Sequence, residues 1–366
     1  MRFPEFSGEW KTKSINDLAD VIGGGTPDTT VKSYWDGGIQ WFTPSEIGKN
    51  KFVDASLRTI TEEGLNNSCA KLLPPNTILL SSRATIGECS LSLRECATNQ
   101  GFQSLVSKKC NVDFLYYLIQ TKKKDLIRKS CGSTFLEISA NEVRKIQVSV
   151  PSDVEQQKIA GLLSLIDKRI ATQNKIIEDL KLLKSAIAET VFNNMKGHLT
   201  NLSAICSIVK GKQVNGEELS EKGKYYVMNG GITPSGYYDQ CNTPANTISI
   251  SEGGNSCGYV QYNKPSFWSG GHCYTLQDIS SGVETQYLFH YLKRYESNIM
   301  KLRIGTGLPN IQKKDLENFR IVLPPSNVQK EIATCLTAIE HKILVEINWL
   351  DSVQKEKQHL LRQMFI

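Results

Sequence analysis

One long stretch of this chain occurs twice, at an offset of 173 residues. Residues 150–170 have the sequence VPSDVEQQKIAGLLSLIDKRI, and residues 323–343 have LPPSNVQKEIATCLTAIEHKI. A repeat with so long a period indicates two copies of a domain and not a solenoid of short units. The shared positions are Pro151/Pro324, Ile159/Ile332, Ala160/Ala333, Leu163/Leu336, Ile166/Ile339 and Ile170/Ile343.

The same alignment continues on both sides of this stretch. DFLYYLIQ at 113–120 aligns with QYLFHYLK at 286–293, and VRKIQVSVP at 143–151 aligns with LENFRIVLP at 316–324. No gap is needed from 113 to 193, whereas the segments upstream align only with gaps. Each half is therefore expected to be a variable globular domain followed by a more constant helical segment. The expected segments are 1–150, 151–195, 196–322 and 323–366.

The two constant segments have the apolar spacing of long amphipathic helices. Apolar residues recur at steps of three, four and seven, the spacing of a coiled-coil seam. A proline precedes each segment, and Ser152 or Asp153, and Ser326 or Asn327, can cap the two helices. Each helix of about 40 residues would be roughly 60 Å long. The seam residues are Ile159, Leu162, Leu163, Ile166, Ile170, Ile177, Leu180, Leu183, Ile187 and Val191 in the first copy, and Ile332, Leu336, Ile339, Ile343, Ile347, Leu350, Val353, Leu360 and Met364 in the second.

An apolar stripe of this length needs a partner that removes it from water. The other helix of the same chain is the economical partner, so we expect an intramolecular antiparallel pair. A coiled coil between separate chains is the alternative. Joining the final LLRQMFI to the initial MRFPEF would give a second junction like the central one. The chain is therefore expected to have pseudo-twofold symmetry.

The variable domains have the pattern of small mixed sheets. Short β-type runs such as TILLSS at 77–82 and NTISIS at 246–251 lie between Gly, Asn and Pro turns. The expected fold class is mixed α/β. It consists of two globular α/β domains joined by two long antiparallel coiled-coil helices, with an internal pseudo-twofold repeat.

The positive charge of the chain is concentrated in the variable domains. The formal net charge is +6. Residues 1–150 have 19 Lys and Arg against 16 Asp and Glu, and residues 196–322 have 13 against 10. The helical segments are neutral, with 6 against 6 and 5 against 5. This distribution favours two domains that face a polyanion, although such an excess also arises by chance.

Other sequence features limit the class of protein. No apolar run approaches the roughly 18 residues of a membrane span, and the N-terminus lacks the apolar centre of a signal peptide. The ten cysteines include no Cys-x-x-Cys pair, which disfavours zinc and a secreted disulfide framework. We expect reduced thiols, a cytoplasmic location and no contact with a membrane.

Polar loops recur at matching places in the two variable domains. They supply Arg, Asn, Gln, Glu, Ser, Thr and Gly, the residue types that contact base edges and phosphates in the major groove. A basic face on the helix over 113–129 adds lysines, although loops and faces of this kind are also common in ordinary turns and solvated helices. The expected DNA-binding residues are Thr43, Ser45, Ser82, Arg83, Thr85, Asn99, Gln100, Lys122, Lys123, Ser133 and Thr134 in the first domain, and Asn229, Thr233, Glu252, Asn255, His272, Lys301, Arg303, Thr306 and Asn310 in the second.

The sequence contains no recognisable catalytic motif. There is no Gly-x-x-x-x-Gly-Lys-Ser/Thr loop, and GGG at 23–25 is interpreted as a turn. LPPN and LPPS only resemble the Asn/Asp-Pro-Pro-Tyr/Phe motif of amino-directed methyltransferases. His272 and Cys273 are adjacent, but no third group is positioned by the sequence. The chain is expected to be non-catalytic, with no cofactor and no metal.

These residues together resemble a known family. LLSSRATIGE, ATNQGF and GST, followed by EISANEVRKIQVSVPSDVEQQKIAGLLSLIDKRI, are similar to a target-recognition domain and the conserved helix that follows it in the specificity (S) subunit of type I restriction–modification systems. The second half is similar but looser, with SEGGNSCGYV, GTGLPNIQKKDLENFRIVLPP and VQ in place of EQ at 328–329. RFPEFSGEW near the start also resembles the opening of this family.

The resemblance implies a role in DNA recognition. Each variable domain would be a target-recognition domain that contacts one half of a split sequence in double-stranded DNA. The helices would dock two methyltransferase (M) subunits, which supply S-adenosylmethionine binding and adenine methylation, and motor-nuclease (R) subunits would join for restriction. We expect the partner-binding residues to be Ile159, Ile166, Ile170, Ile332, Ile339 and Ile343.

Two alternatives to this interpretation remain. In the first, the chain is the specificity subunit of a methylation-only or other multi-subunit modification system. In the second, it is a coiled-coil scaffold whose globular ends bind protein. DNA binding with a steep salt dependence separates a DNA-reading subunit from a scaffold, because phosphate contacts release counterions.

Overall fold

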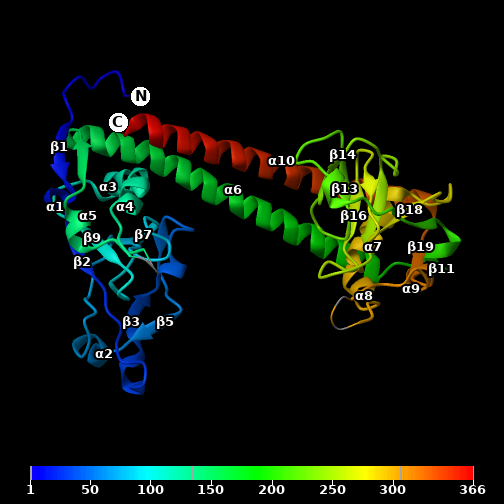
Figure 1. Ribbon diagram of the computed structural model, residues 1–366, viewed down its shortest axis with the longest axis horizontal. Helices are drawn as coiled ribbons and strands as arrows, with labels where there is room; N and C mark the ends of the chain where they lie inside the picture. The colour runs from blue at the N-terminus through cyan, green and yellow to red at the C-terminus, as the bar shows by residue number, and fades with distance from the viewer. Residues whose placement is uncertain (1, 133–135, 306, 308, 366) are drawn as a thin grey trace. The chain divides into compact units, whose positions relative to one another are not determined.

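The computed structural model describes residues 2–132, 136–305, 307 and 309–365 (Figure 1). The chain divides into two compact units, Met1–Asn174 with Trp349–Ile366 and Lys175–Asn348. The divisions fall inside the two long helices, α6 (Asp153–Asn193) and α10 (Ser326–Met364). Each unit therefore contains one globular domain and a part of both long helices.

Unit 1 contains a five-stranded and a three-stranded sheet. The larger sheet has the order β2-β9-β6-β7-β4, and the smaller has the order β5-β3-β8. Figure 1 shows the smaller sheet at the end of the unit away from α6. The strands are β1 (Lys11–Ser14), β2 (Ala19–Gly23), β3 (Trp35–Phe42), β4 (Phe52–Val53), β5 (Arg58–Ile60), β6 (Ile78–Leu80), β7 (Cys89–Ser92), β8 (Cys96–Thr98), β9 (Gln103–Ser107) and β10 (Gln147–Val150), and the helices are α1 (Ile15–Leu18), η1 (Lys32–Tyr34), η2 (Pro44–Glu46), α2 (Glu62–Asn66), α3 (Val112–Thr121), α4 (Lys123–Arg128) and α5 (Ala140–Arg144).

Unit 2 repeats this topology with one strand fewer in the larger sheet. Its sheets have the orders β12-β18-β15-β16 and β14-β13-β17. In the smaller sheet, β13 pairs antiparallel with β14 and parallel with β17, as β3 does with β5 and β8. The strands are β11 (His198–Asn201), β12 (Ser207–Lys210), β13 (Tyr225–Met228), β14 (Gly236–Tyr238), β15 (Thr247–Ser251), β16 (Val260–Asn263), β17 (Trp268–Ser269), β18 (Cys273–Gln277) and β19 (Arg320–Leu323), and the helices are η3 (Leu202–Ala204), η4 (Gly216–Glu218), α7 (Thr285–Arg294), α8 (Glu296–Met300) and α9 (Lys313–Glu317).

The core of each unit is centred on one amphipathic helix and closed by both long helices. In unit 1, α3 buries Phe114 to Ile119 against the larger sheet, together with Leu163 of α6 and Phe365 beyond α10. In unit 2, α7 occupies the equivalent place. Phe365 lies 5.2 Å from Phe114 between ring centroids, and Phe192, its equivalent in the repeat, lies 5.8 Å from Tyr287. The end of each long helix is thus fixed on the helix that the repeat predicts.

The long helices pair with each other within the chain, as the sequence predicts. In unit 1, Asp167 Oδ1 and Lys357 Nζ form an ion pair at 2.6 Å. In unit 2, Glu340 Oε1 and Lys184 Nζ form an ion pair at 2.9 Å. At the repeat offset of 173 residues, Asp167 corresponds to Glu340 and Lys184 corresponds to Lys357. The same ion pair therefore occurs in both units, with the helix that supplies each charge exchanged. This exchange is what pseudo-twofold symmetry requires, and the expected mixed α/β fold with paired helices is confirmed.

A second polar contact between the domain helix and α6 or α10 is also repeated. The Tyr117 hydroxyl lies 3.3 Å from Ser164 Oγ, while the equivalent His290 lies 2.9 Å from Thr337 Oγ1, the equivalent of Ser164. Burial, reinforced by the nearby charge of Lys184, lowers the pKa of His290 to about 4. The imidazole is therefore neutral near pH 7 and serves as a structural hydrogen-bonding group.

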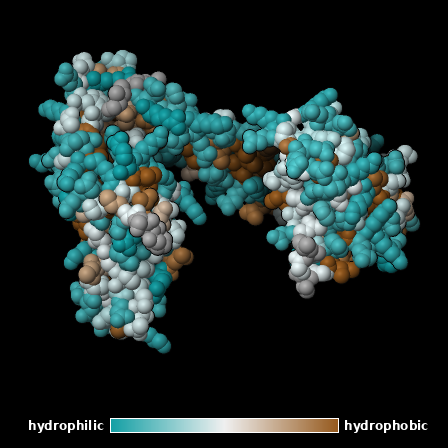
Figure 2. Space-filling view, in the orientation of Figure 1, coloured by the Kyte–Doolittle hydropathy of each residue, from teal (hydrophilic) through white to brown (hydrophobic). Residues whose placement is uncertain are grey.

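The surface of the long helices includes exposed apolar side chains that the core does not use. Figure 2 shows hydrophobic residues along the visible stretch of these helices, which are otherwise largely polar. In the described residues, no helix has both the length and the apolar character that crossing a bilayer needs. The exposed apolar side chains of the long helices include Leu165, Leu182, Leu183, Leu344, Val345 and Ile347.

A buried glutamine joins the start of each long helix to the preceding domain. Gln156 Nε2 donates to the carbonyl of Pro151 at 3.0 Å, and its Oε1 accepts from the backbone N–H of Asn111, which precedes α3, at 3.1 Å. Gln329 makes the equivalent bonds to Pro324 at 2.9 Å and to the N–H of Glu284 at 2.9 Å. Both side chains are at most 3% exposed. Each glutamine satisfies backbone groups of two elements that water does not reach.

Replacing either glutamine is expected to destabilise its unit. Gln156→Leu leaves buried backbone groups without partners, at a cost of about 1–3 kcal/mol in the free energy of unfolding, and Gln329→Leu should behave alike. Urea unfolding measures the loss. The control is Gln157→Leu, at an exposed neighbouring position, with an effect within about 0.5 kcal/mol. Equal stability of the Gln156 and Gln157 variants would contradict this role.

Candidate nucleic-acid interface

In each unit, two of the loops singled out in the sequence meet each other and a third segment. In unit 1, the backbone N–H of Ser82 donates to Gly101 at 2.8 Å, and Ile138 donates to Ser82 at 3.1 Å. In unit 2, Glu252 donates to His272 at 2.9 Å, and Ile311 donates to Glu252 at 2.9 Å. The loop after β6 or β15 is therefore held between the loop before β9 or β18 and the segment that leads to α5 or α9.

Glycines allow a fourth segment to approach these loops. A Cβ at Gly24 would lie 2.0 Å from the carbonyl oxygen of Asn99, and one at Gly211 would lie 2.2 Å from that of Gly270. Both distances are shorter than any real contact, so only glycine fits. The GGG at 23–25 is thus a place of close backbone packing beside the loop that carries Asn99.

Arg83 is an exposed cation in the first of these loops, and it has a partner. Its side chain is 45% exposed, and its NH2 group lies 2.7 Å from Glu137 Oε2. This hydrogen bond raises the pKa of Arg83. Sequence reasoning did not find Glu137. The spacing between the two residues gives no signal, because only the backbone bridge between Arg83 and Glu137 brings them together.

The other expected residues of unit 1 differ in accessibility. Ser82 is fully buried, so its side chain is not available to DNA in this structure. Thr43 donates to Glu46 at 2.6 Å in a capping arrangement, and Lys123 forms an ion pair with Glu88. Ser45, Thr85 and Gln100 are exposed, whereas Asn99 and Lys122 are half-buried; Ser133 and Thr134 lie outside the described residues.

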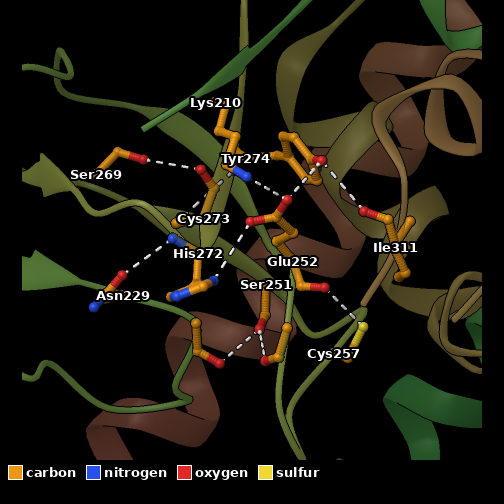
Figure 3. A network of polar contacts seen from close by, with 12 residues as sticks. Lys210, Asn229, Ser251, Glu252, Cys257, Ser269, His272, Cys273, Tyr274 and Ile311 are labelled. Atoms are coloured by element: carbon orange, nitrogen blue, oxygen red, sulfur yellow. Dashed lines mark hydrogen bonds and ion pairs between the residues drawn. The ribbon is translucent and has the colours of Figure 1, made fainter. Parts of the chain in front are cut away.

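Glu252 in unit 2 is the centre of a polar network (Figure 3). Its Oε1 accepts from Lys210 Nζ at 2.6 Å and from the Tyr274 hydroxyl at 3.0 Å, and its Oε2 lies 3.6 Å from His272 Nδ1. Only 8% of Glu252 is exposed, while the His272 side chain is 64% exposed. The network holds Glu252 in place beside His272, and no sequence motif points to Lys210 or Tyr274.

Two of the remaining expected residues of unit 2 contact residues beside this network. Asn229 Oδ1 accepts from the backbone N–H of His272 at 3.1 Å, which places Asn229 beside the exposed ring. Asn310 pairs with Gly253 through a backbone bridge. Thr233, Asn255, Lys301, Arg303 and Asn310 are exposed, and Thr306 lies outside the described residues.

The described loops expose polar side chains, and two observations bear on their chemistry. Burial raises the pKa of Cys273, beside His272, to about 11, so this thiol is protonated near pH 7. Among the residues that the structure describes, no group of three or more His, Cys, Asp or Glu side chains is placed to hold a metal ion. Exposed Arg, Thr, Asn, Gln and His side chains are suited to hydrogen bonding with base edges and phosphates.

Comparison with known proteins agrees with this arrangement. The family described as "Type I restriction modification DNA specificity domain" matches residues 7–182 and again residues 199–352. Two matches to a DNA specificity domain define the class of the chain as a duplicated specificity protein. The chain belongs to the family of type I restriction–modification specificity subunits.

Relatives and solved structures extend over nearly the whole chain. The type I restriction enzyme MjaIX specificity subunit of Methanocaldococcus jannaschii is 28% identical and aligns with 97% of this chain and 92% of its own length. The EcoprrI specificity subunit of Escherichia coli is 24% identical and aligns with 88% of this chain and 85% of its own length. The crystal structure of the S subunit from M. genitalium, 19% identical, has a TM-score of 0.69 over 100% and 99% of the two chains.

We predict that Arg83 contacts a base. Arg83→Ala should then cost about 1–3 kcal/mol in binding to the target and relax the preference at one position, while a phosphate contact would weaken binding to all sequences alike. Competition binding with duplexes substituted at single positions distinguishes the two. Arg94→Ala is a matched control, because Arg94 is also exposed and paired with a carboxylate, Asp54. Unchanged affinity and preference in Arg83→Ala would leave Arg83 with a structural role only.

Proposed function

We propose that this chain is the non-catalytic subunit that determines which DNA sequence a type I restriction–modification complex recognises. Each globular domain would contact one half of a bipartite target in double-stranded DNA. The observation that carries the proposal is the same three-loop arrangement in both units, with Ser82 and Glu252 at equivalent central positions. Two copies of one interface on one chain suit a target with two separate halves.

The chemistry of the loops supports major-groove contact. Arg83, Thr85 and Gln100 in unit 1 and Asn255, His272 and Asn310 in unit 2 are exposed on loops that the sheets hold in place. Arginine and amide side chains can make paired hydrogen bonds to base edges, which distinguish the four base pairs. The two sets of side chains differ between the units, so the half-sites are expected to differ in sequence.

Methyl transfer and DNA cleavage would belong to partner subunits. The family resemblance assigns these activities to two methyltransferase subunits and to motor-nuclease subunits. One similar solved structure, 16% identical with a TM-score of 0.61, is described as concerning complex assembly of the type I restriction–modification system. A methylation-only complex would use the same subunit without the motor.

The long helices are the proposed docking surface for the methyltransferase subunits. Of the six isoleucines expected to contact a partner, Ile159 is buried in the core of unit 1, and Ile166, Ile170, Ile332, Ile339 and Ile343 are half-buried. Leu182 is 65% exposed and Leu344 47% exposed on the same helices. Apolar side chains left in water on a polar helix favour contact with another protein, so the proposed contact is centred on the exposed residues.

Exchange of one domain tests the proposal directly. The chain is co-expressed with methyltransferase partners, and the methylated sequence is mapped before and after residues 1–150 are replaced by those of a relative with a different target. Only one half of the methylated sequence should change, because the two three-loop interfaces share no residue. The control exchange of 196–322 should change only the other half. A change in both halves after one exchange, or no sequence preference at all, would refute the proposal.

Lengthening both long helices together should alter the gap between the half-sites. Four residues inserted after Asn174 and four after Asn348, where the units divide, add about 6 Å, or one to two base pairs, and about one helical turn. These positions leave the contacts within each unit intact. The mapped methylation sequence should keep both halves and gain a longer unspecified gap. An active variant with the original gap would show that the methyltransferase partners fix the spacing.

A further inference from the structure

Unit 1 contains a large cleft beside the expected DNA-binding loops. It has a volume of about 2060 Å³ and lies between the globular domain and the parts of α6 and α10 that belong to this unit. The domain side consists of the loop over 48–52, the end of the loop over 81–88, and α3 and α4. The helix side includes Lys168 and Arg362. Every lining residue belongs to unit 1.

The lining of this cleft is strongly basic. It includes nine Lys or Arg side chains and three carboxylates. Each carboxylate is already paired with a lysine: Glu88 with Lys123, Asp113 with Lys51 at 2.6 Å, and Asp167 with Lys357 at 2.6 Å. Lys355 pairs with Asp351. No ion pair within the described residues neutralises the remaining five cations, which are Lys49, Lys122, Lys124, Lys168 and Arg362.

The internal repeat shows which charged residues of the cleft have a charged equivalent in unit 2. Asp167 and Lys357 are retained in unit 2 as Glu340 and Lys184, and the two still form an ion pair. Four of the five unpaired cations are not retained: the offset of 173 gives Tyr295 for Lys122, Ser297 for Lys124, His341 for Lys168 and Glu189 for Arg362. Unit 2 folds on the same plan without these charges. These four cations of unit 1 are therefore not needed to build the fold.

We infer that this cleft binds the sugar–phosphate backbone of DNA next to the half-site that unit 1 contacts. The inference rests on the proposed function and adds a contact site that includes the long helices. The cleft is continuous with the loop of Arg83, because Gly87 and Glu88 of that loop line it and Lys123 pairs with Glu88. Five unpaired cations on several elements match a row of phosphates, and such contacts are independent of base sequence.

The binding is asymmetric between the two halves of the target. Because unit 2 lacks four of the five equivalent charges, the flank beside the half-site of unit 1 gains phosphate contacts that the other flank does not. The neutral total charge of the helices conceals this feature, since Lys168 and Arg362 are balanced by acidic residues elsewhere on the same helices.

The test is the salt dependence of DNA binding by the full chain with three lining cations replaced. A Lys49→Gln, Lys168→Gln, Arg362→Gln variant should lower the slope of log K against log salt by about 2 to 3, since each phosphate contact contributes about 0.9. Affinity should fall by the same factor, on the order of tenfold or more, for the target duplex and for an unrelated duplex. The methylated sequence should not change.

A variant with the same loss of charge outside the cleft is the control. Lys181→Gln, Lys222→Gln, Lys330→Gln removes three exposed cations of unit 2 and should leave the slope nearly unchanged. Thermal unfolding of both variants checks that they fold. A slope equal to that of the wild type in the cleft variant overturns the inference. So does a variant that binds DNA normally but no longer assembles with the methyltransferase subunit, because the occupant would then be an acidic protein surface.

Failure of this inference is distinguishable from failure of the proposed function. Without the proposed function, the wild-type chain would show no preference between target and unrelated duplexes. Without the cleft contact, that preference would be intact and the two triple variants would have the same salt slope.

Discussion

The architecture depends on how each long helix is joined to the domain before it. Gln156 and Gln329 are buried where the strand, the domain helix and the long helix meet, and each bonds backbone groups of two of these elements. A domain that moved relative to its helix would break these bonds in a place without water. Because an unpaired buried polar group costs about 1–3 kcal/mol, the joint is held in one geometry. The loops of each domain are then carried at a fixed position on the helix.

The repeat divides residues into those that build this joint and those that are free to vary. Ion pairs between the helices, the glutamine joint and the aromatic contacts of Phe192 and Phe365 occur in both units. Arg83 and Glu137, by contrast, correspond to Gly253 and Asn310, and the network around Glu252 has no equivalent charge at Ser82. Constant joints with variable loops are what a protein needs if its target changes while its assembly is preserved.

The sequence predicted the parts of the fold that repeat. The apolar spacing and the proline before each segment located α6 and α10, and the offset of 173 located the domain helices and their contacts. It did not predict the accessibility of the loop residues, because accessibility depends on backbone bridges between distant segments. Ser82 follows an apolar strand in a polar loop, yet its backbone bonds to Gly101 and Ile138 hold it where it is buried. Glu252 is buried through side-chain bonds from Lys210 and Tyr274.

The total charge of a segment does not say how its charges are distributed in space. The helices are neutral overall, which favours struts that do not contact DNA. In unit 1, however, Asp167 is the only carboxylate of the long helices that lines the cleft among the described residues, and it is paired with Lys357. Lys168 and Arg362 therefore line the cleft without an acidic partner. An electrostatic surface is set by which charges are paired, and pairing is decided by the fold. Under the proposed backbone contact, the parts of α6 and α10 that belong to unit 1 would add DNA affinity beside one half-site only.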